Sequence, residues 1–163
     1  MGEISNKMEK FRNLIDKIIE LFCTVIMIIM TVLVSWQVFT RYVFNKPSTV
    51  TEQLCQYLFI WLVLFGSAFI FGKRGHMQIV FIKDKLPPKI GMICDVIQEV
   101  IIFTFTLGVL VVGGYQSSMR QMVQVDAALQ IPVGVIYAAI PLSGVFVLFY
   151  SVLNMKKIIG KNS

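Results

Sequence analysis

Two carboxylates four residues apart, Asp95 and Glu99, are the groups in this largely apolar sequence that are best placed to do chemistry. Side chains at this spacing share one face of a helix. Ionisable groups at membrane depth often belong to proton or cation pathways. Two acids are too few for a relay across a bilayer, however, and negative charge is also favoured near the start of a helix. We therefore favour an interfacial or subunit-contact role for this pair over an ion pathway.

Other reactive side chains are few. His76 is the one histidine, and it follows Lys73 and Arg74 in a basic segment. A histidine can act as a pH switch or a metal ligand, but no second histidine or cysteine lies nearby. The three cysteines lie in or beside apolar runs without a Cys-x-x-Cys spacing, which favours small buried residues over disulfides or a zinc site. We predict that Lys73, Arg74 and His76 contact lipid head groups.

A catalytic constellation is also missing. The sequence shows no nucleophile–base pair, no metal-ligand spacing and no phosphate-binding loop. We therefore predict that the chain is not an enzyme and that it uses no cofactor and no metal.

Four apolar segments must position these groups, at residues 21–41, 53–72, 90–115 and 130–154. At ~1.5 Å per residue, about 20 helical residues cross a hydrocarbon layer of ~30 Å. The composition agrees, because 56% of the residues are hydrophobic and only 15% are charged. Backbone groups in hydrocarbon must bond within their own segment. We therefore predict an all-α integral membrane protein in which residues 1–163 form a single domain with four transmembrane helices.

The basic residues predict the orientation of these helices. All but three of the 15 lysines and arginines lie in the N-terminal tail, the loop between the second and third spans, or the C-terminal tail; the exceptions are Arg41, Lys46 and Arg120. Basic loops stay on the cytoplasmic side of a membrane, so both termini are expected there. The net charge of +6 thus indicates topology and contact with anionic phospholipids, not nucleic-acid binding.

Residues 7–20 precede the first span and have apolar side chains at steps of three and four. This pattern predicts an amphipathic helix that lies on the inner membrane surface and continues into the span. The alternative is a docking helix for a partner protein, and both roles are compatible.

Individual residues in and beside the spans give further predictions. Thr49 and Glu52 match a helix capping box, although Glu52 could instead pair with Arg41 or with a partner subunit. Trp61 lies near the middle of the second span, where its indole N–H favours a protein-facing position. Pro141 lies inside the fourth apolar run and predicts a kink, because proline removes a backbone hydrogen bond.

The order of these features resembles the DctQ-like family, the small membrane subunits of TRAP transporters (tripartite ATP-independent periplasmic transporters). The resemblance covers roughly residues 10–157. It rests on residues 36–44 (WQVFTRYVF), Thr51-Glu52, residues 58–68 (LFIWLVLFGSA), Arg74-Gly75-His76-Met77, Leu86-Pro87, residues 128–132 (ALQIP), Tyr137 and Pro141. The chain departs from the family at Val50 and Thr51, where a tryptophan and a second acid often stand, and at residues 79–81, where an aspartate often follows the histidine motif.

This resemblance implies a bacterial inner-membrane protein with two partners. A large multi-span subunit would carry the substrate and sodium sites and move as an elevator. A periplasmic binding protein would deliver an organic acid of the C4-dicarboxylate or sialic acid class. The small subunit would brace the static scaffold of the large one.

Polar or aromatic groups at membrane depth need protein partners, so five residues are candidates for the contact with the large subunit: Arg41, Glu52, Trp61, Asp95 and Glu99. In the predicted periplasmic loops, Lys46, Gln124 and Asp126 are candidates for contact with the binding protein. The alternative functions are a self-assembling small channel or holin-like protein, which needs a polar stripe along one span, and a small membrane enzyme, which lacks a catalytic constellation here.

Overall fold

The computed structural model describes residues 2–44, 48–73 and 88–160, and nearly all of these residues are helical. Four stretches within them are long and apolar enough to cross a membrane: Glu9–Val43, Thr49–Gly72, Ile93–Gln121 and Val133–Lys156. In this described part of the chain, β-structure is limited to an isolated bridge between Val125 and Pro132. The predicted all-α architecture with four spans is therefore confirmed.

The four spans are built from several helical segments. In chain order these are α1 (Gly2–Val43), α2 (Thr49–Gly72), α4 (Pro88–Phe105), the π-helix η1 (Thr106–Gly113), α5 (Gly114–Gln121), α6 (Val133–Tyr137) and α7 (Ala139–Gly160). The third span thus comprises α4, η1 and α5, and the fourth comprises α6 and α7.

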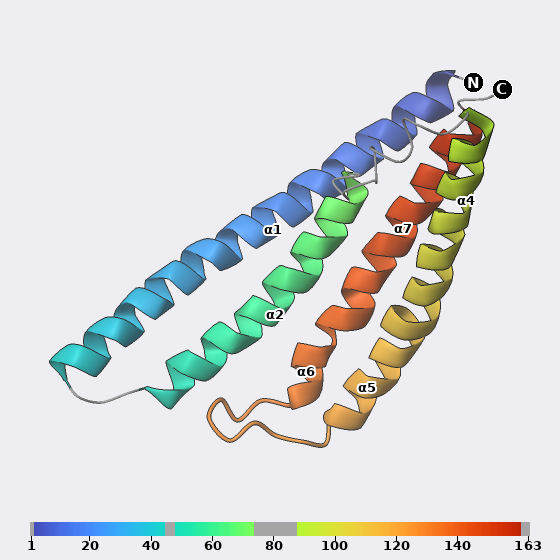
Figure 1. Ribbon diagram of the computed structural model, residues 1–163. Helices are drawn as coiled ribbons and strands as arrows, with labels where there is room; N and C mark the ends of the chain where they lie inside the picture. Colours follow the sequence, from blue (N-terminus) through green and yellow to red (C-terminus); the bar gives the residue numbers. More distant parts are fainter. Residues whose placement is uncertain (1, 45–47, 74–87, 161–163) are drawn as a thin grey trace.

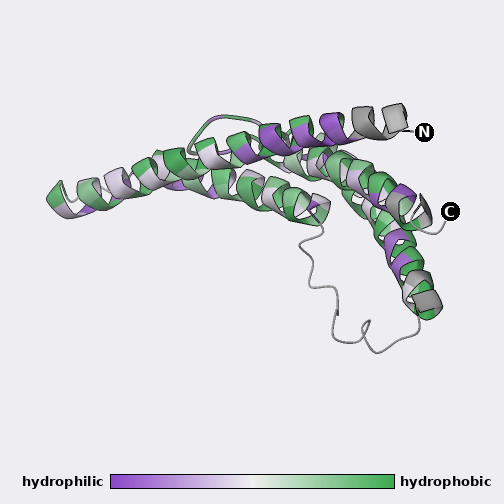
Figure 2. Cartoon of the chain, turned by 90° about the horizontal axis from the view of Figure 1, so that it is seen from above, coloured by the Kyte–Doolittle hydropathy of each residue, from purple (hydrophilic) through white to green (hydrophobic). Residues whose placement is uncertain are grey.

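The spans lie side by side in the order α1, α2, α6–α7 and α4–η1–α5 (Figure 1). Seen from above, they form a thin, bent layer rather than a closed bundle, and hydrophobic residues cover most of their length (Figure 2). The two chain termini lie at one end of this layer, called the terminus end below. The connections that follow α1 and α5 lie at the opposite end, called the loop end (Figure 1). A layer one helix thick leaves both faces open, and large apolar side chains are accordingly exposed on every span.

A buried core joins α1, α2 and α7 towards the terminus end. Its members include Ile19, Phe65, Phe71 and Tyr150, and the Tyr150 side chain is fully buried. Gly72 allows this packing, because a Cβ atom there would lie 2.6 Å from the Tyr150 ring. The core therefore depends on close approach of α7 to the end of α2.

Residues 7–20, predicted as an interfacial helix, form the first part of α1 and continue into the first span without a break. Two hydrogen bonds attach this part to the rest of the chain. The Tyr150 hydroxyl donates to Asp16 Oδ1 at 2.5 Å, and the Arg12 guanidinium donates to the carbonyl oxygen of Gly72. One face of the amphipathic segment thus contacts protein, while residues such as Leu14 and Ile18 remain exposed.

The start of α2 differs in detail from the sequence prediction. The N-cap is Ser48, whose hydroxyl accepts a hydrogen bond from the Thr51 amide at 3.4 Å. The cap therefore lies one residue before Thr49, the residue expected from the capping-box pattern, and Glu52 lies one position beyond the place where a reciprocal acid would stand. Glu52 remains in the first turn of α2, where its charge interacts favourably with the helix dipole.

The fourth span is interrupted close to Pro141, as the sequence predicts. Pro132 is the N-cap of α6, which ends at Tyr137, and α7 begins at Ala139 after a turn at Ala138. Pro141 has no N–H for the carbonyl of Tyr137, four residues earlier, and its ring conflicts with that carbonyl. The hydrogen-bond ladder is consequently interrupted one turn before the proline, while the Ala138 backbone keeps α-helical angles and its N–H still donates to the Gly134 carbonyl at 2.9 Å.

Candidate subunit-contact site

Glu99, one of the two carboxylates singled out in the sequence, is buried between the third and fourth spans. Its side chain is 9% exposed, and its Oε2 atom accepts a hydrogen bond at 2.8 Å from the fully buried Ser151 hydroxyl of α7. Asn154 lies one turn further along α7 and is also buried, while Asp95 lies one turn before Glu99 and is half-buried. The structure thus brings Glu99 into a polar contact within the chain.

Trp61 also packs inside the helix layer. Its indole stacks on the Phe65 ring, with centroids 5.6 Å apart and an angle of 7° between the planes, and it meets the Phe22 ring of α1 edge-on at 6.2 Å. Phe65 in turn contacts Phe22 at 5.0 Å and Phe146 of α7 at 5.7 Å. Such pairs contribute roughly 0.5–1.5 kcal/mol each beyond area burial. The aromatic cluster that contains Trp61 therefore joins three spans.

Arg41 and Glu52 are both exposed at the loop end, in the last turn of α1 and the first turn of α2. Each charge is favourable for the dipole of its own helix, and each remains accessible to another molecule. Of the five large-subunit candidates, these two are the exposed charges.

Lys73 is the described member of the predicted head-group cluster. It caps the C-terminal end of α2, and its Nζ lies 4.2 Å from the centre of the Phe69 ring, a cation–π geometry. The other two members, Arg74 and His76, lie outside the described residues, as does the partner candidate Lys46.

Asp126 organises the loop between α5 and α6. Its Oδ1 atom accepts hydrogen bonds from the amides of Ala128 at 2.9 Å and Leu129 at 2.8 Å. Its Oδ2 atom accepts from the Tyr57 hydroxyl of α2, which itself accepts from Gln53 Nε2 at 2.8 Å. The Tyr57 hydroxyl, followed by the Leu129 amide, holds the pKa of the Asp126 carboxyl below its ordinary value of 3.8. Hydrogen bonds within the chain thus occupy this partner candidate.

Gln124 keeps an exposed side chain in the same loop, while its carbonyl oxygen accepts from the Val133 amide at 2.8 Å. The roles of Gln53 and Tyr57 were not foreseen from the sequence. Their spacing of four on one helix face, near a loop that contains a carboxylate, is the signal that could have indicated them.

Hydroxyl groups exposed on the spans bond to their own helices. They donate to the carbonyl four residues earlier at Thr24, Thr31, Ser35, Ser67 and Thr104. Within residues 2–44, 48–73 and 88–160, every buried side-chain nitrogen or oxygen has a hydrogen-bond partner, and no group of three histidines, cysteines or carboxylates could hold a metal ion. The described residues therefore offer little free polarity at membrane depth.

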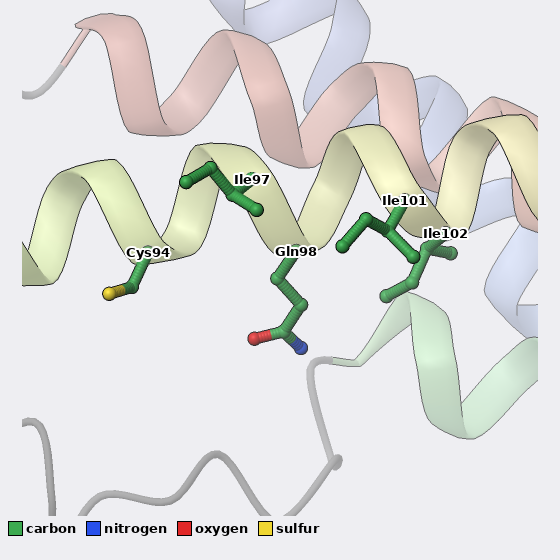
Figure 3. Close-up of a pocket in the computed structure, with 5 residues that line it drawn as sticks. All are labelled: Cys94, Ile97, Gln98, Ile101 and Ile102. Carbon is green, nitrogen blue, oxygen red and sulfur yellow. The ribbon is translucent and has the colours of Figure 1, made fainter.

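A shallow depression on the third span is mainly apolar. Cys94, Ile97, Gln98, Ile101 and Ile102 line it, and all five side chains come from α4 (Figure 3). A depression formed by one helix surface lacks the convergent polar groups of a substrate site.

Comparison with known proteins identifies the family. Residues 30–160 match the family described as "Tripartite ATP-independent periplasmic transporters, DctQ component". The chain belongs to this family. The resemblance inferred from the sequence is confirmed, and this DctQ-family chain is a transporter component, not an enzyme, and a multi-pass protein of the inner membrane.

Its relatives carry related names. The chain is 28% identical over 156 residues to a sialic acid TRAP transporter small permease protein SiaQ of Vibrio cholerae, an alignment that covers 94% of this chain and 90% of the relative. It is 36% identical over 81 residues, half of each protein, to a putative TRAP transporter small permease protein of Haemophilus influenzae. It is also 24% identical over 113 residues to the sialic acid TRAP transporter permease protein SiaT of Haemophilus influenzae, covering 69% of this chain but only 18% of that longer protein.

Proposed function

We propose that this chain braces the large elevator-type permease subunit of a sodium-driven TRAP transporter that takes up an organic acid delivered by a periplasmic binding protein. The observation that carries this proposal is the family match across residues 30–160, combined with a helix layer that spans the membrane but satisfies its buried polar groups internally. Such a layer adds lipid and protein contact area without forming a conduit for solute.

The similarity to SiaT supports a direct association with the large subunit. A segment similar to this chain occupies a small part of that long permease protein. In that relative, the segment similar to this chain and the rest of the permease therefore belong to one polypeptide. In the present chain the exposed Arg41 and Glu52 are the first candidates for the contact, because their charges are not buried within the layer.

The names of two relatives favour a sialic acid over a C4-dicarboxylate as the transported acid. The substrate preference itself would reside in the partner proteins, since the depression on α4 is mainly apolar.

The orientation is part of the proposal. Lys10, Lys17, Lys73 and Lys156 are all exposed near the terminus end of the layer. By the positive-inside rule this end faces the cytoplasm, where the same lysines can contact anionic phospholipids. The loop end would then face the periplasm and the binding protein. A reporter enzyme that is active only in the periplasm should therefore be inactive when fused to either terminus and active when inserted after Val123.

Reconstitution tests the transport role. Proteoliposomes that hold this chain together with the large permease subunit and the loaded binding protein of the same bacterium should accumulate sialic acid only under an inward sodium gradient. Omission of this chain should abolish most uptake, and this chain alone should transport nothing. Full uptake without this chain would contradict the proposal, while conductance or uptake by this chain alone would favour the small-channel alternative. If succinate is taken up in place of sialic acid, the proposed bracing role stands and the transported acid is a C4-dicarboxylate.

A further inference from the structure

The third and fourth spans both lose regular α-helical hydrogen bonding at the same level of the layer. The third span forms the π-helix η1 at Thr106–Gly113, and the fourth is interrupted at Ala138. These places are neighbours, because a Cβ atom on Gly114, directly after η1, would lie 2.8 Å from Ile140 Cγ2 and 3.1 Å from the Pro141 nitrogen. Extended π-helical hydrogen bonding is rare and often marks a functional site, and a proline break is a defined cause of helix bending.

Beyond these breaks, residues 114–137 form a connected group, called the loop-end unit here; it contains α5, the loop and α6. The buried Ser118 hydroxyl of α5 donates to the Gly134 carbonyl of α6 at 2.7 Å. The helices are so close that a Cβ atom on Gly134 would lie 2.5 Å from the Ser118 carbonyl oxygen. In the loop, the Asp126 amide donates to the Ile131 carbonyl at 2.9 Å. These contacts favour motion of the unit as one body.

On the other side of the breaks, α4 and α7 are joined by different contacts. The buried Glu99–Ser151 hydrogen bond links the two helices, and Tyr150 fixes α7 in the core with α1 and α2. Each half of this helix pair therefore has its own hydrogen bonds. The two halves meet at the irregular backbone, where Gly114 packs against Ile140 and Pro141, and where a Cβ atom on Gly144 would lie 2.9 Å from Leu110 Cβ.

One hydrogen bond reaches from the loop-end unit to a different span. The Tyr57 hydroxyl of α2 donates to Asp126, the residue that also orders the loop. Since α2 is a continuous helix from Thr49 to Gly72, it provides a fixed neighbour for the unit.

We infer that residues 114–137 form a hinged unit that bends at η1 and Ala138, and that the Tyr57–Asp126 hydrogen bond holds it against α2. The loop-end unit carries Val123, which is 89% exposed, so its displacement would change the surface at that end of the protein. The Tyr57–Asp126 hydrogen bond has a charged acceptor and stabilises the arrangement in which the loop-end unit lies against α2. Removal of this bond should raise the population of the displaced unit roughly tenfold.

Distances between spin labels test this inference. The full chain is placed in lipid nanodiscs after Cys23, Cys55 and Cys94 are changed to alanine, and labels are attached through Gln56→Cys in α2 and Val123→Cys in the loop; both positions are exposed. The distance distribution should be narrow with the natural Tyr57 and should broaden toward longer distances in Tyr57→Phe. Tyr115→Phe is the matched control, because Tyr115 is an exposed residue of the same unit.

Two further label pairs distinguish hinge motion from general loosening. In Tyr57→Phe, the distances between Val123 and Val135 inside the unit, and between Ile97 and Val152 beyond the breaks, should keep their natural widths. Broadening of all three pairs, or of none, would overturn the inference.

A second substitution tests the position of the hinge. Pro141→Ala restores a backbone N–H and permits a continuous helix through Ala138. Added to Tyr57→Phe, it should narrow the distance distribution between Gln56 and Val123 again. An unchanged width would overturn the placement of the hinge at this break.

Discussion

The terminus end and the loop end of the helix layer differ in how much of their surface is covered by the chain itself. Along the packed face of α1, Ile19 and Ile26 are 1% and 4% exposed, whereas Leu33, Gln37 and Thr40, further along the same face towards the loop end, are only half-buried. The same helix therefore passes from a packed environment into an open one.

Polar contacts join helices at both ends, but the exposed charges differ between the ends. At the terminus end, buried or half-buried groups join three helices, as in the Tyr150–Asp16 and Glu99–Ser151 pairs. At the loop end, the buried Ser118 hydroxyl of α5 bonds to the Gly134 carbonyl of α6 and Asp126 holds a surface loop, while the charges of Arg41 and Glu52 are exposed. The exposed charges of the loop end are the reason for proposing that partner proteins bind there.

The largest expected effect comes from removing the core aromatic residue. Tyr150→Ala should lower the free energy of unfolding by about 3 kcal/mol, because it leaves a cavity and removes the hydroxyl bound to Asp16. Tyr42→Ala, at the exposed end of α1, should change it by less than ~0.5 kcal/mol. Reversible unfolding of the two variants in mixed micelles measures both values. Similar losses in the two variants would contradict the contrast between the ends.

A smaller effect is expected at the buried polar pair. Ser151→Ala leaves the Glu99 carboxyl group without its hydroxyl donor and should cost about 1–3 kcal/mol. Ser67→Ala removes an exposed hydroxyl that bonds only to its own helix, at Val63, and should be nearly neutral. Thermal denaturation of the two variants in the same detergent gives the comparison. If Ser151→Ala is as stable as Ser67→Ala, the pair does not hold α4 to α7.

Sequence patterns correctly predicted an all-α protein with four spans, because the number of apolar residues needed to cross a bilayer is a strong constraint. They also located the interruption at Pro141, which follows from the missing N–H. The cap of α2 was placed one residue late, because Ser48 and Thr49 are both good N-cap residues and the Thr49–Glu52 spacing favoured the second.

The pairing of polar groups could not be read from periodicity. Glu99 shares a helix face with Asp95, but its partner Ser151 is 52 residues away, and only the packing of α7 beside α4 brings them together. Likewise, Tyr57 and its hydrogen-bond partner Asp126 are 69 residues apart in the sequence. For this reason, the sequence alone does not reveal that the Asp126 carboxylate bonds within the chain; its contact with a partner protein stays a prediction.

The loop at Asp126 should respond to acid. Its folded-state pKa lies below the ordinary value of 3.8, owing first to the Tyr57 hydroxyl and then to the Leu129 amide. The contribution of the carboxylate is therefore fully present above about pH 4 and is lost as the pH falls through the lowered folded-state pKa. Hydrogen exchange at the Ala128 and Leu129 amides, corrected for the intrinsic rate, should lose protection in that acid range. Asp126→Asn should remove this pH dependence, and an unchanged profile in that variant would contradict the assignment.

The smallest effect on the chain itself is expected at the exposed charges of the loop end. Arg41→Gln and Glu52→Gln should each change the free energy of unfolding by less than ~0.5 kcal/mol, because exposed charges gain little from their surroundings in water. If the open end binds the large permease subunit, the same variants should still reduce recovery of that subunit when this chain is purified through an affinity tag. Lys10→Gln, an exposed charge at the opposite end of α1, is the matched control and should leave recovery unchanged. Equal recovery with all three variants would remove Arg41 and Glu52 from the interface and direct the search to the apolar faces of the layer.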